Sequence, residues 1–284
     1  MSEVLRSWKA GSASRLVWID YDAYAHTIFS SSSPEWLRDP VRRVSALEQA
    51  QRIVSSQVLT IDLAAPCLAA AGNTQGGGVG AITDALSADA PAAYLATLLD
   101  AIGHRLGQRM DVVVSVPSPR DLLIAAGMSA DETPSFNDLD DVGMALADLA
   151  RGLSSKTIHG LLVTISEPAR FEADDAEATG SLIAAVRHFG WAAAVATPST
   201  GWPPPDTLLS DVDADLFLYP EVSLQDVVAL GNRKVGGGLG KAFWSDSSGG
   251  AGSASGVALY GAIPSAMQPE QVLTRLSTLA PAQA

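Results

Sequence analysis

Cysteine and histidine are scarce in this sequence. The single cysteine, Cys67, cannot form an internal disulfide or a multi-cysteine zinc site. The histidines stand apart, and none forms a His-x-His, His-x-x-x-His or His-x-Cys pair, the spacings that are typical of zinc ligands. The sequence therefore predicts no bound metal and no other cofactor, although carboxylates alone leave a magnesium site conceivable. The four histidines are His26, His104, His159 and His188.

Basic charge and long apolar runs are also lacking. Lys and Arg number 18 against 31 Asp and Glu, which gives a formal net charge of -13 and disfavours nucleic acids and anionic membranes as partners. No segment reaches the ~18 uninterrupted apolar residues of a membrane-spanning helix, and the first residues lack the apolar run of a signal peptide. We expect a cytoplasmic protein with a small-molecule substrate and with neither nucleic-acid nor membrane partners. A homodimer stays open.

The sequence does contain short β-branched or apolar runs that alternate with longer amphipathic segments. Helix-stop signals fall at most of the boundaries between them. Eight such runs with interleaved helices predict a single α/β domain over residues 1–284, a (β/α)8 or TIM barrel. The predicted strands are 15–20, 57–63, 111–117, 160–166, 191–197, 214–220, 233–239 and 256–262. The predicted helices are 34–55, 89–108, 119–127, 138–152, 174–189, 222–231 and 268–279.

Three segments rich in Gly, Ser or Pro interrupt the alternation, each after a predicted strand. They are residues 72–80, 197–206 and 245–256, and their composition predicts that they hold no regular element. At the mouth of a barrel the third would be a candidate lid. The alternative is that all three are ordinary surface loops.

Polar residues at the ends of the predicted strands are the candidate site, because a barrel of this type carries its chemistry there. Asp62 follows the apolar run "QVLTI". Burying it unpaired would cost several kcal/mol, so it either acts in catalysis or caps a neighbouring element. Glu167, which Pro168 holds extended, could accept a proton, bind a substrate cation or pair with Arg170.

Two carboxylates in one pocket raise one another's proton affinity, which keeps a general acid protonated near neutral pH. We therefore predict Asp62 as proton donor or cation stabiliser and Glu167 as the second carboxylate. Tyr219 and Tyr24 would orient the substrate, and Arg120 would hold a substrate carboxylate. The other predicted substrate-binding residues are Asp20, Asp22, Trp202 and Glu221. For Trp202, in a proline-stiffened loop, the alternative is a surface or dimer contact.

Four segments resemble the uroporphyrinogen decarboxylase superfamily, which also contains cobalamin-independent methionine synthase and corrinoid-linked methyltransferases. They read "SSQVLTIDLAAPCLAAAG" (55–72), "VVVSVPSPRDLLIAAG" (112–127), "KTIHGLLVTISEP" (156–168) and "YGAIPSAMQPEQVLTRL" (260–276). The resemblance implies a TIM barrel and puts Asp62 at the decarboxylase position that stabilises a protonated pyrrole. It also matches Glu167 and Pro168 to a Glu-Pro pair of the methionine synthase branch.

The departures from the family are as informative. The segment "VWIDYDAY" carries Asp20 and Asp22 where the decarboxylases carry arginines that hold the tetrapyrrole carboxylates. Each exchange changes the local charge by two units, at about 4 kcal/mol for a close pair at intermediate dielectric, so a polyanionic porphyrinogen should be repelled. Gly261 and Ala262 stand where the family has a late histidine, and "AVATPST" (194–200) lacks the zinc ligands of methionine synthase.

Three functions follow as expectations. The first is a cofactor-independent decarboxylase or C–C lyase that acts on a small, non-porphyrin substrate. The second is a methyltransferase of the methionine synthase or corrinoid type without its usual zinc site. The third is a non-catalytic accessory or binding barrel that has kept the fold and lost the site.

Overall fold

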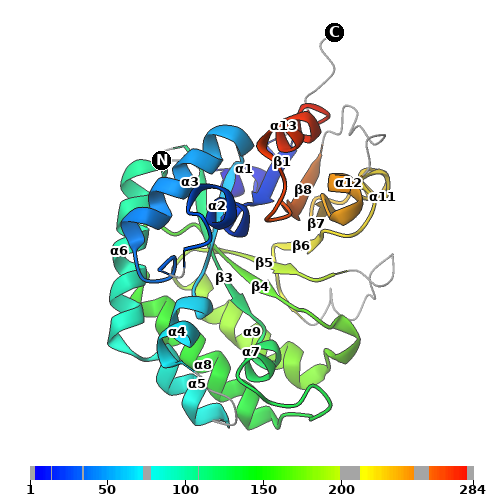
Figure 1. The fold of residues 1–284 in the computed structure, drawn as a ribbon. Helices are drawn as coiled ribbons and strands as arrows, with labels where there is room; N and C mark the ends of the chain where they lie inside the picture. The colour runs from blue at the N-terminus through cyan, green and yellow to red at the C-terminus, as the bar shows by residue number, and fades with distance from the viewer. Residues whose placement is uncertain are drawn as a thin grey trace.

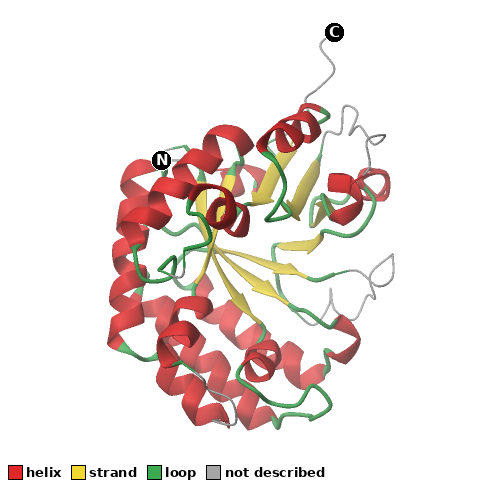
Figure 2. Cartoon of the chain, viewed as in Figure 1, coloured by secondary structure: helices red, strands yellow, loops and turns green. Residues whose placement is uncertain are grey.

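Eight parallel strands form one nearly closed barrel that helices surround (Figures 1 and 2). This computed structural model describes residues 4–13, 15–33, 35–72, 78–107, 109–198, 212–245 and 256–279. The strand order is β1-β8-β7-β6-β5-β4-β3-β2, so that each strand from β2 onward pairs with its successor in sequence and β8 returns to β1. The predicted α/β class and (β/α)8 barrel are confirmed.

All eight predicted strands are present, each within two residues of the expected bounds. Apolar runs bounded by Gly, Pro or Asp located them correctly because a parallel strand in a barrel is buried on both faces. The strands are β1 (Arg15–Asp20), β2 (Val58–Asp62), β3 (Asp111–Pro117), β4 (Gly160–Thr164), β5 (Ala192–Ala196), β6 (Leu216–Tyr219), β7 (Val235–Gly238) and β8 (Val257–Ala262).

The seven predicted helices are present, and one of them begins later than expected. The helix expected from residue 34 begins at Pro40, because the Asp39 side chain accepts the amide of Arg42 and proline takes the first helical position. These helices are α3 (Pro40–Val54), α6 (Asp89–Arg105), α7 (Pro119–Ala125), α8 (Phe136–Gly152), α9 (Ala173–Arg187), α11 (Leu224–Leu230) and α13 (Pro269–Ser277).

Several further helices, each of nine residues or fewer, are absent from the prediction. The expectation that residues 72–80 hold no regular element is wrong at their end, since a helix begins at Gly78. The others lie at the N-terminus or directly after a strand, where a run such as "AAPCLAAA" has too little polar contrast to show a helical period. They are α1 (Val4–Lys9), α2 (Asp22–Phe29), α4 (Ala64–Ala71), α5 (Gly78–Leu86), α12 (Lys241–Ser245) and the 3₁₀ turn Pro168–Arg170.

Alternating residues of the strands fill the barrel interior. Trp18 lies opposite Tyr260 in the β1–β8 register, and their rings meet edge to face at 5.4 Å. The indole Nε1 of Trp18 donates a hydrogen bond to Thr60 Oγ1 at 2.8 Å. Leu and Val side chains share the interior with the small residues Ala194, Ala196 and Ala258, and Trp18 fills part of the space that these alanines leave.

The seam between β1 and β2 is closed by side-chain contacts together with one backbone hydrogen bond, from the amide of Gln57 to the carbonyl of Val17. In the part of the chain that the structure describes, β1 and β2 are the first and last strands in the order of hydrogen-bonded neighbours. The amide of Val17 donates to Gln57 Oε1 at 2.6 Å, and the amide of Ile19 donates to Ser56 Oγ at 3.0 Å. Polar side chains thus replace the missing backbone acceptors of β1, which satisfies its buried amides.

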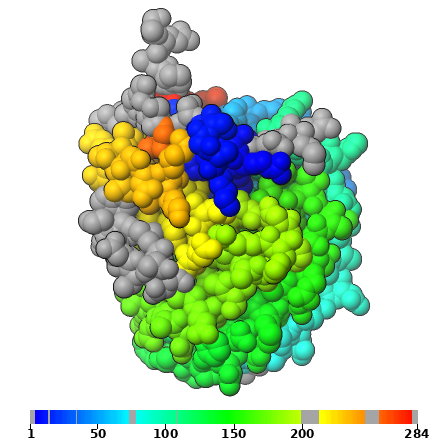
Figure 3. Space-filling view, turned by 180° about the vertical axis from the view of Figure 1, so that it is seen from behind, coloured from blue at the N-terminus to red at the C-terminus, as the bar shows by residue number. Residues whose placement is uncertain are grey.

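Helix α1 lies across the N-terminal end of the barrel. The amide of Leu5 donates to Asp111 Oδ2 at 2.7 Å, and Trp8 Nε1 donates to the carbonyl of Arg233 at 3.2 Å. Seen from behind, the dark-blue N-terminal segment lies on the surface between the yellow-orange and green segments (Figure 3). The opposite end of the barrel, where the strands end, is left for the candidate site.

Candidate active site

A pocket of about 260 Å³ lies at the C-terminal ends of the strands. We call it the mouth pocket. Strands β1 to β4 and the end of β8 contribute to its walls, which is where barrel enzymes place their chemistry. Its polar lining residues are Asp20, Asp22, Thr60, Asp62, Ser115 and Thr164.

Strand alternation brings Asp20 and Asp62 to the same pocket. Each stands two residues beyond an interior side chain, Trp18 on β1 and Thr60 on β2, so each faces the barrel axis at the end of its strand. Ser115 pairs with Asp62 in the β2–β3 register and adds a hydroxyl next to it. The site is therefore built on strand ends, which hold side chains more rigidly than loops.

Asp20 is the carboxyl group whose acidity is most clearly changed. Burial, helped by the nearby charges of Asp22 and Asp62, raises its pKa from 3.8 to about 6. A hydrogen bond from the amide of Asp22 to Asp20 Oδ1, 3.2 Å long, and the charge of Arg43 oppose this rise. Near neutral pH, Asp20 can therefore both give and take a proton.

Asp62 lies in the mouth pocket and also caps a helix. Its Oδ1 accepts the amides of Ala64 and Ala65 at 2.8 and 3.1 Å, at the start of α4. Burial raises the pKa of Asp62, although these two hydrogen bonds act in the opposite direction. The capping and functional interpretations of Asp62 are thus compatible, because only one of its oxygens is used by the helix.

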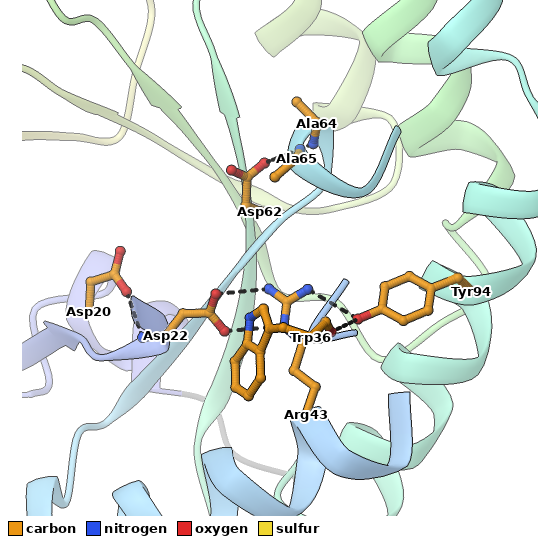
Figure 4. A network of polar contacts seen from close by, with 8 residues as sticks. All are labelled: Asp20, Asp22, Trp36, Arg43, Asp62, Ala64, Ala65 and Tyr94. Atoms are coloured by element: carbon orange, nitrogen blue, oxygen red, sulfur yellow. Dashed lines mark hydrogen bonds and ion pairs between the residues drawn. The ribbon is translucent and has the colours of Figure 1, made fainter. Parts of the chain in front are cut away.

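Asp22 is neutralised by a buried arginine that the sequence did not suggest (Figure 4). Arg43 on α3 is fully buried, and its Nε and Nη2 donate to the two oxygens of Asp22 at 3.2 and 3.0 Å. Its Nη1 lies 3.4 Å from the hydroxyl of Tyr94, which donates to the carbonyl of Trp36. Bidentate pairs of this kind are among the stronger hydrogen-bonded contacts in proteins, so Arg43 holds the Asp22 side chain in place behind the pocket.

Replacing Asp20 with asparagine should stabilise the protein at neutral pH. Because the folded pKa of about 6 exceeds the ordinary 3.8, protonated Asp20 favours the fold below about pH 4, and this contribution is lost as pH rises through 6. Asparagine resembles the protonated form. Urea unfolding of Asp20→Asn should show about 1–3 kcal/mol of added stability at pH 7.5 and little change at pH 4.

The matched control for this measurement is Asp84→Asn. Asp84 is an exposed residue of α5, and its replacement should change the free energy of unfolding by less than about 0.5 kcal/mol at either pH. Equal stabilisation of Asp20→Asn at both pH values would contradict the raised pKa.

Glu167 and Arg120 each bind a partner in the protein. The carboxylate of Glu167 is 56% exposed and lies 3.0 Å from Arg170 Nε, the pairing that was one of the alternatives for it. Nε and Nη2 of Arg120 each lie 2.7 Å from an oxygen of Asp175, and both side chains are buried. Neither Glu167 nor Arg120 lines the mouth pocket.

The two tyrosines predicted to orient the substrate are buried. Tyr24 on α2 is completely buried, and its hydroxyl has no hydrogen-bond partner among the described residues. Burial raises the pKa of Tyr24 and also that of Tyr219, which ends β6. Both hydroxyls are thus neutral at physiological pH. Trp202 lies outside the described residues, so its predicted role stays a prediction.

The carboxylate of Glu221 reaches the loop after β7, a part of the fold where many barrels bind phosphate. It follows β6, and its Oε2 accepts the amide of Lys241 at 3.1 Å, at the start of the short α12 after β7. A side chain at Gly240 would collide with this carboxylate. The Glu221 carboxylate therefore takes the place that a phosphate would occupy at that loop, and its negative charge would repel a phosphate there.

The residues that sequence reasoning missed are Arg43, Thr60 and Thr164, whereas Ser115 was expected among the polar residues at the strand ends. Thr60 could have been found, since it lies two residues before Asp62 on the same face of a predicted strand. Among the described residues, no three His, Cys, Asp or Glu side chains gather into a metal-binding group.

Known proteins resemble the chain in fold alone. No protein-family model matches the sequence, and no curated protein matches it. A methyltransferase from Methanosarcina mazei superposes with a TM-score of 0.70 at 11% identity, over 98% of this chain and 97% of that one. A structure described as "a putative phosphonomutase from Burkholderia cenocepacia J2315" aligns over 98% and 97% of the two chains at 13% identity, with a TM-score of 0.45. The first likeness supports the barrel architecture over the whole chain.

Proposed function

We propose that the chain is a barrel enzyme, a cofactor-independent decarboxylase or C–C lyase that acts on a small non-porphyrin substrate at the mouth pocket. The observation that supports this most is Asp20, a carboxyl group with a pKa of about 6, in the same pocket as Asp62. Perturbed carboxyl groups in a concave site at the ends of barrel strands are the usual signature of acid–base catalysis.

The two carboxyl groups suit different parts of such a reaction. Breaking a carbon–carbon bond leaves an electron pair on one carbon, and protonated Asp20 would deliver the proton that this carbon needs. Ionised Asp62 would stabilise positive charge that develops on the substrate, with its orientation fixed by the amides of Ala64 and Ala65. The hydroxyls of Thr60, Ser115 and Thr164 would position the substrate.

The pocket also limits the substrate. Its volume of about 260 Å³ is below the 300–1,000 Å³ typical of sites for drug-sized ligands, which favours a small molecule. Asp20, Asp22 and Asp62 make its lining acidic, and the nearby cation Arg43 is already bound to Asp22. We therefore propose a substrate that bears an amine or another cationic group in addition to the group that leaves.

The proposal predicts a defined pH dependence. Turnover that uses protonated Asp20 as the acid should fall as pH rises above about 6, because the acid form is lost there. Asp20→Asn should lower kcat about 10²- to 10⁴-fold and remove this limb of the profile. The measurement is a screen of small amines, amino acids and carboxylates by thermal shift, followed by turnover of the ligands that bind.

Two variants sharpen this experiment. Asp62→Asn should abolish the thermal shift caused by cationic ligands, while Asp84→Asn, exposed on α5, should keep it. A ligand that stabilises all the proteins equally would place its site away from the mouth pocket and would count against the proposal.

Methyl transfer is the second candidate, and the fold shared with a methyltransferase over nearly the whole chain favours it. In this case the mouth pocket would accept a methyl group from a corrinoid protein or a methylated donor. Transfer of an isotope-labelled methyl group from methylcobalamin to a small amine or thiol, without release of CO₂, would support it over the lyase.

A further inference from the structure

A second cavity, larger than the mouth pocket, opens at the opposite end of the barrel. It has a volume of about 500 Å³, and we call it the basal cavity. Side chains of the barrel interior and of α1 form its apolar walls, and the loops that precede β6 and β7 form its rim. The apolar residues that define it are Leu5, Trp8, Trp18, Val113, Ala194 and Leu216.

The basal cavity lies where strands β4 and β5 contribute small residues to the barrel interior. Strand β5 reads "AAAVA", and its interior position Ala194 has only a methyl group where barrels of this class usually carry Val, Ile or Leu. Gly160 at the start of β4 cannot fill the gap, because a Cβ there would lie 2.8 Å from the carbonyl of Ala192. The small strand residues therefore contribute to the volume of the basal cavity, together with α1 and the loops at its rim.

The rim of the basal cavity is basic in a chain that is otherwise acidic. Four cations, Lys9, Arg187, Arg233 and Lys234, line it with only two carboxylates, although the chain as a whole carries a net charge of -13. The two carboxylates are already paired, Asp215 with Lys9 at 2.7 Å and Asp213 with Arg187 at 3.3 Å.

This pairing leaves two rim cations for a ligand. Neither Arg233 nor Lys234 has a carboxylate partner within the described part of the chain. Arg233 is held in place, since its Nη2 donates to the carbonyls of Trp8 and Ala13 and its guanidinium lies 4.2 Å from the Trp8 ring. Lys234 is exposed at the edge of the cavity.

We propose that the basal cavity is a second ligand site, which takes a small apolar monocarboxylate. The apolar body would lie against Trp8, Trp18 and Leu216, and the carboxylate would meet Arg233 and Lys234 at the rim. Apolar walls stabilise a bound hydrocarbon chain, and two cations without carboxylate partners stabilise one negative charge, so the cavity fits an apolar monocarboxylate. The site is separate from the mouth pocket and does not depend on the function proposed for it.

Trp18 connects the two ends of the barrel and supplies a reporter. Its ring lines the basal cavity, while its Nε1 donates to Thr60, which lines the mouth pocket. A ligand that fills the basal cavity should therefore change tryptophan fluorescence without entering the mouth pocket.

Octanoate is the probe that tests this site, and 1-octanol is its uncharged control of equal chain length. Titration calorimetry on the full chain should show one saturable octanoate site with affinity at least about tenfold above that of 1-octanol, because the alcohol lacks the charge-assisted contact. The tryptophan emission should change with the same midpoint.

Variants locate the site. Lys234→Met should weaken octanoate binding about fivefold or more, and Ala194→Phe, which fills the cavity, should abolish it. The matched control Lys241→Met removes an exposed lysine at the opposite end and should leave the affinity within about twofold. If Ala194→Phe does not fold, the octanoate affinities of Lys234→Met and Lys241→Met decide whether the ligand binds at the basal cavity.

Three results would overturn the proposal. They are no saturable binding of octanoate by the native chain, equal binding by Lys234→Met and Lys241→Met, and loss of binding in Asp20→Asn. The last would show that octanoate occupies the mouth pocket. Because the readout is binding and not turnover, failure here would leave the function proposed for the mouth pocket untouched.

Discussion

Replacing Arg43 with methionine should lower the free energy of unfolding by about 3–5 kcal/mol, the cost of leaving one partner of a buried ion pair alone. Arg43 is fully buried, and Asp22, its partner, is only 22% exposed. For a chain of this size the loss corresponds to a fall in melting temperature of roughly 6–15 °C. Urea denaturation followed by circular dichroism measures it.

The same variant should change the acidity of the mouth pocket. The charge of Arg43 lowers the pKa of both Asp20 and Asp62, so its removal should raise the pKa of Asp20 above 6. The pH at which turnover or ligand binding changes should rise accordingly. Carboxyl titration by NMR would detect this shift independently of activity.

Arg52→Met is the control for Arg43→Met. Arg52 lies on the same helix, is 74% exposed and pairs with Glu48, so its loss should cost no more than about 1 kcal/mol. Adding Asp22→Asn to Arg43→Met should recover part of the stability, because the carboxylate that has lost its partner is then removed. Similar losses for Arg43→Met and Arg52→Met would contradict the network drawn in Figure 4.

Replacing Arg120 with methionine should lower the free energy of unfolding by a similar amount, about 3–5 kcal/mol, because Asp175 is then buried without its partner. Asp175 is 1% exposed, and its carboxylate also accepts the amide of Glu172 at the start of α9. The double variant Arg120→Met with Asp175→Asn should recover more than half of the loss, because an amide can stay buried without a charge. Thermal and urea unfolding of the two variants provide the measurement.

Arg120→Met also separates two roles for this residue. The sequence predicts that Arg120 holds a substrate carboxylate, whereas the contact with Asp175 favours a structural role. If the role of Arg120 is structural, the Arg120→Met protein should be unstable, but its folded fraction should bind ligand normally. Stable protein with weakened ligand binding would instead support the role in substrate binding. Arg170→Met, which removes the exposed pairs of Arg170 with Asp131 and Glu167, is the control.

The strands were predictable because their signal is local. A strand buried on both faces needs an unbroken apolar run, and runs such as that of β3 show this directly. The short helices that follow strands, α4 for example, were not predictable. Eight residues of mostly alanine carry no helical periodicity, and α4 is held by the Asp62 cap and by packing.

The candidate site was predictable in part for the same reason. Asp20 and Asp62 were identified because each ends an apolar run, and strand ends meet at the mouth of any barrel. Arg43 was not identified. On an amphipathic helix an arginine is usually a solvated residue, and nothing near Arg43 in sequence indicates that Asp22, 21 residues away, would meet it inside the protein.

The sequence by itself determined the architecture, the acidic surface and the carboxyl groups at the strand ends, because these follow from local pattern and composition. Only the tertiary structure decided which charges are free. Partners far apart in the chain, 55 residues for Arg120 and Asp175, depend on how the helices pack around the barrel. The basal cavity likewise appears only when small residues from separate strands face one axis. The acidity of Asp20 also belongs to the folded state, since burial among other carboxylates is what raises its pKa.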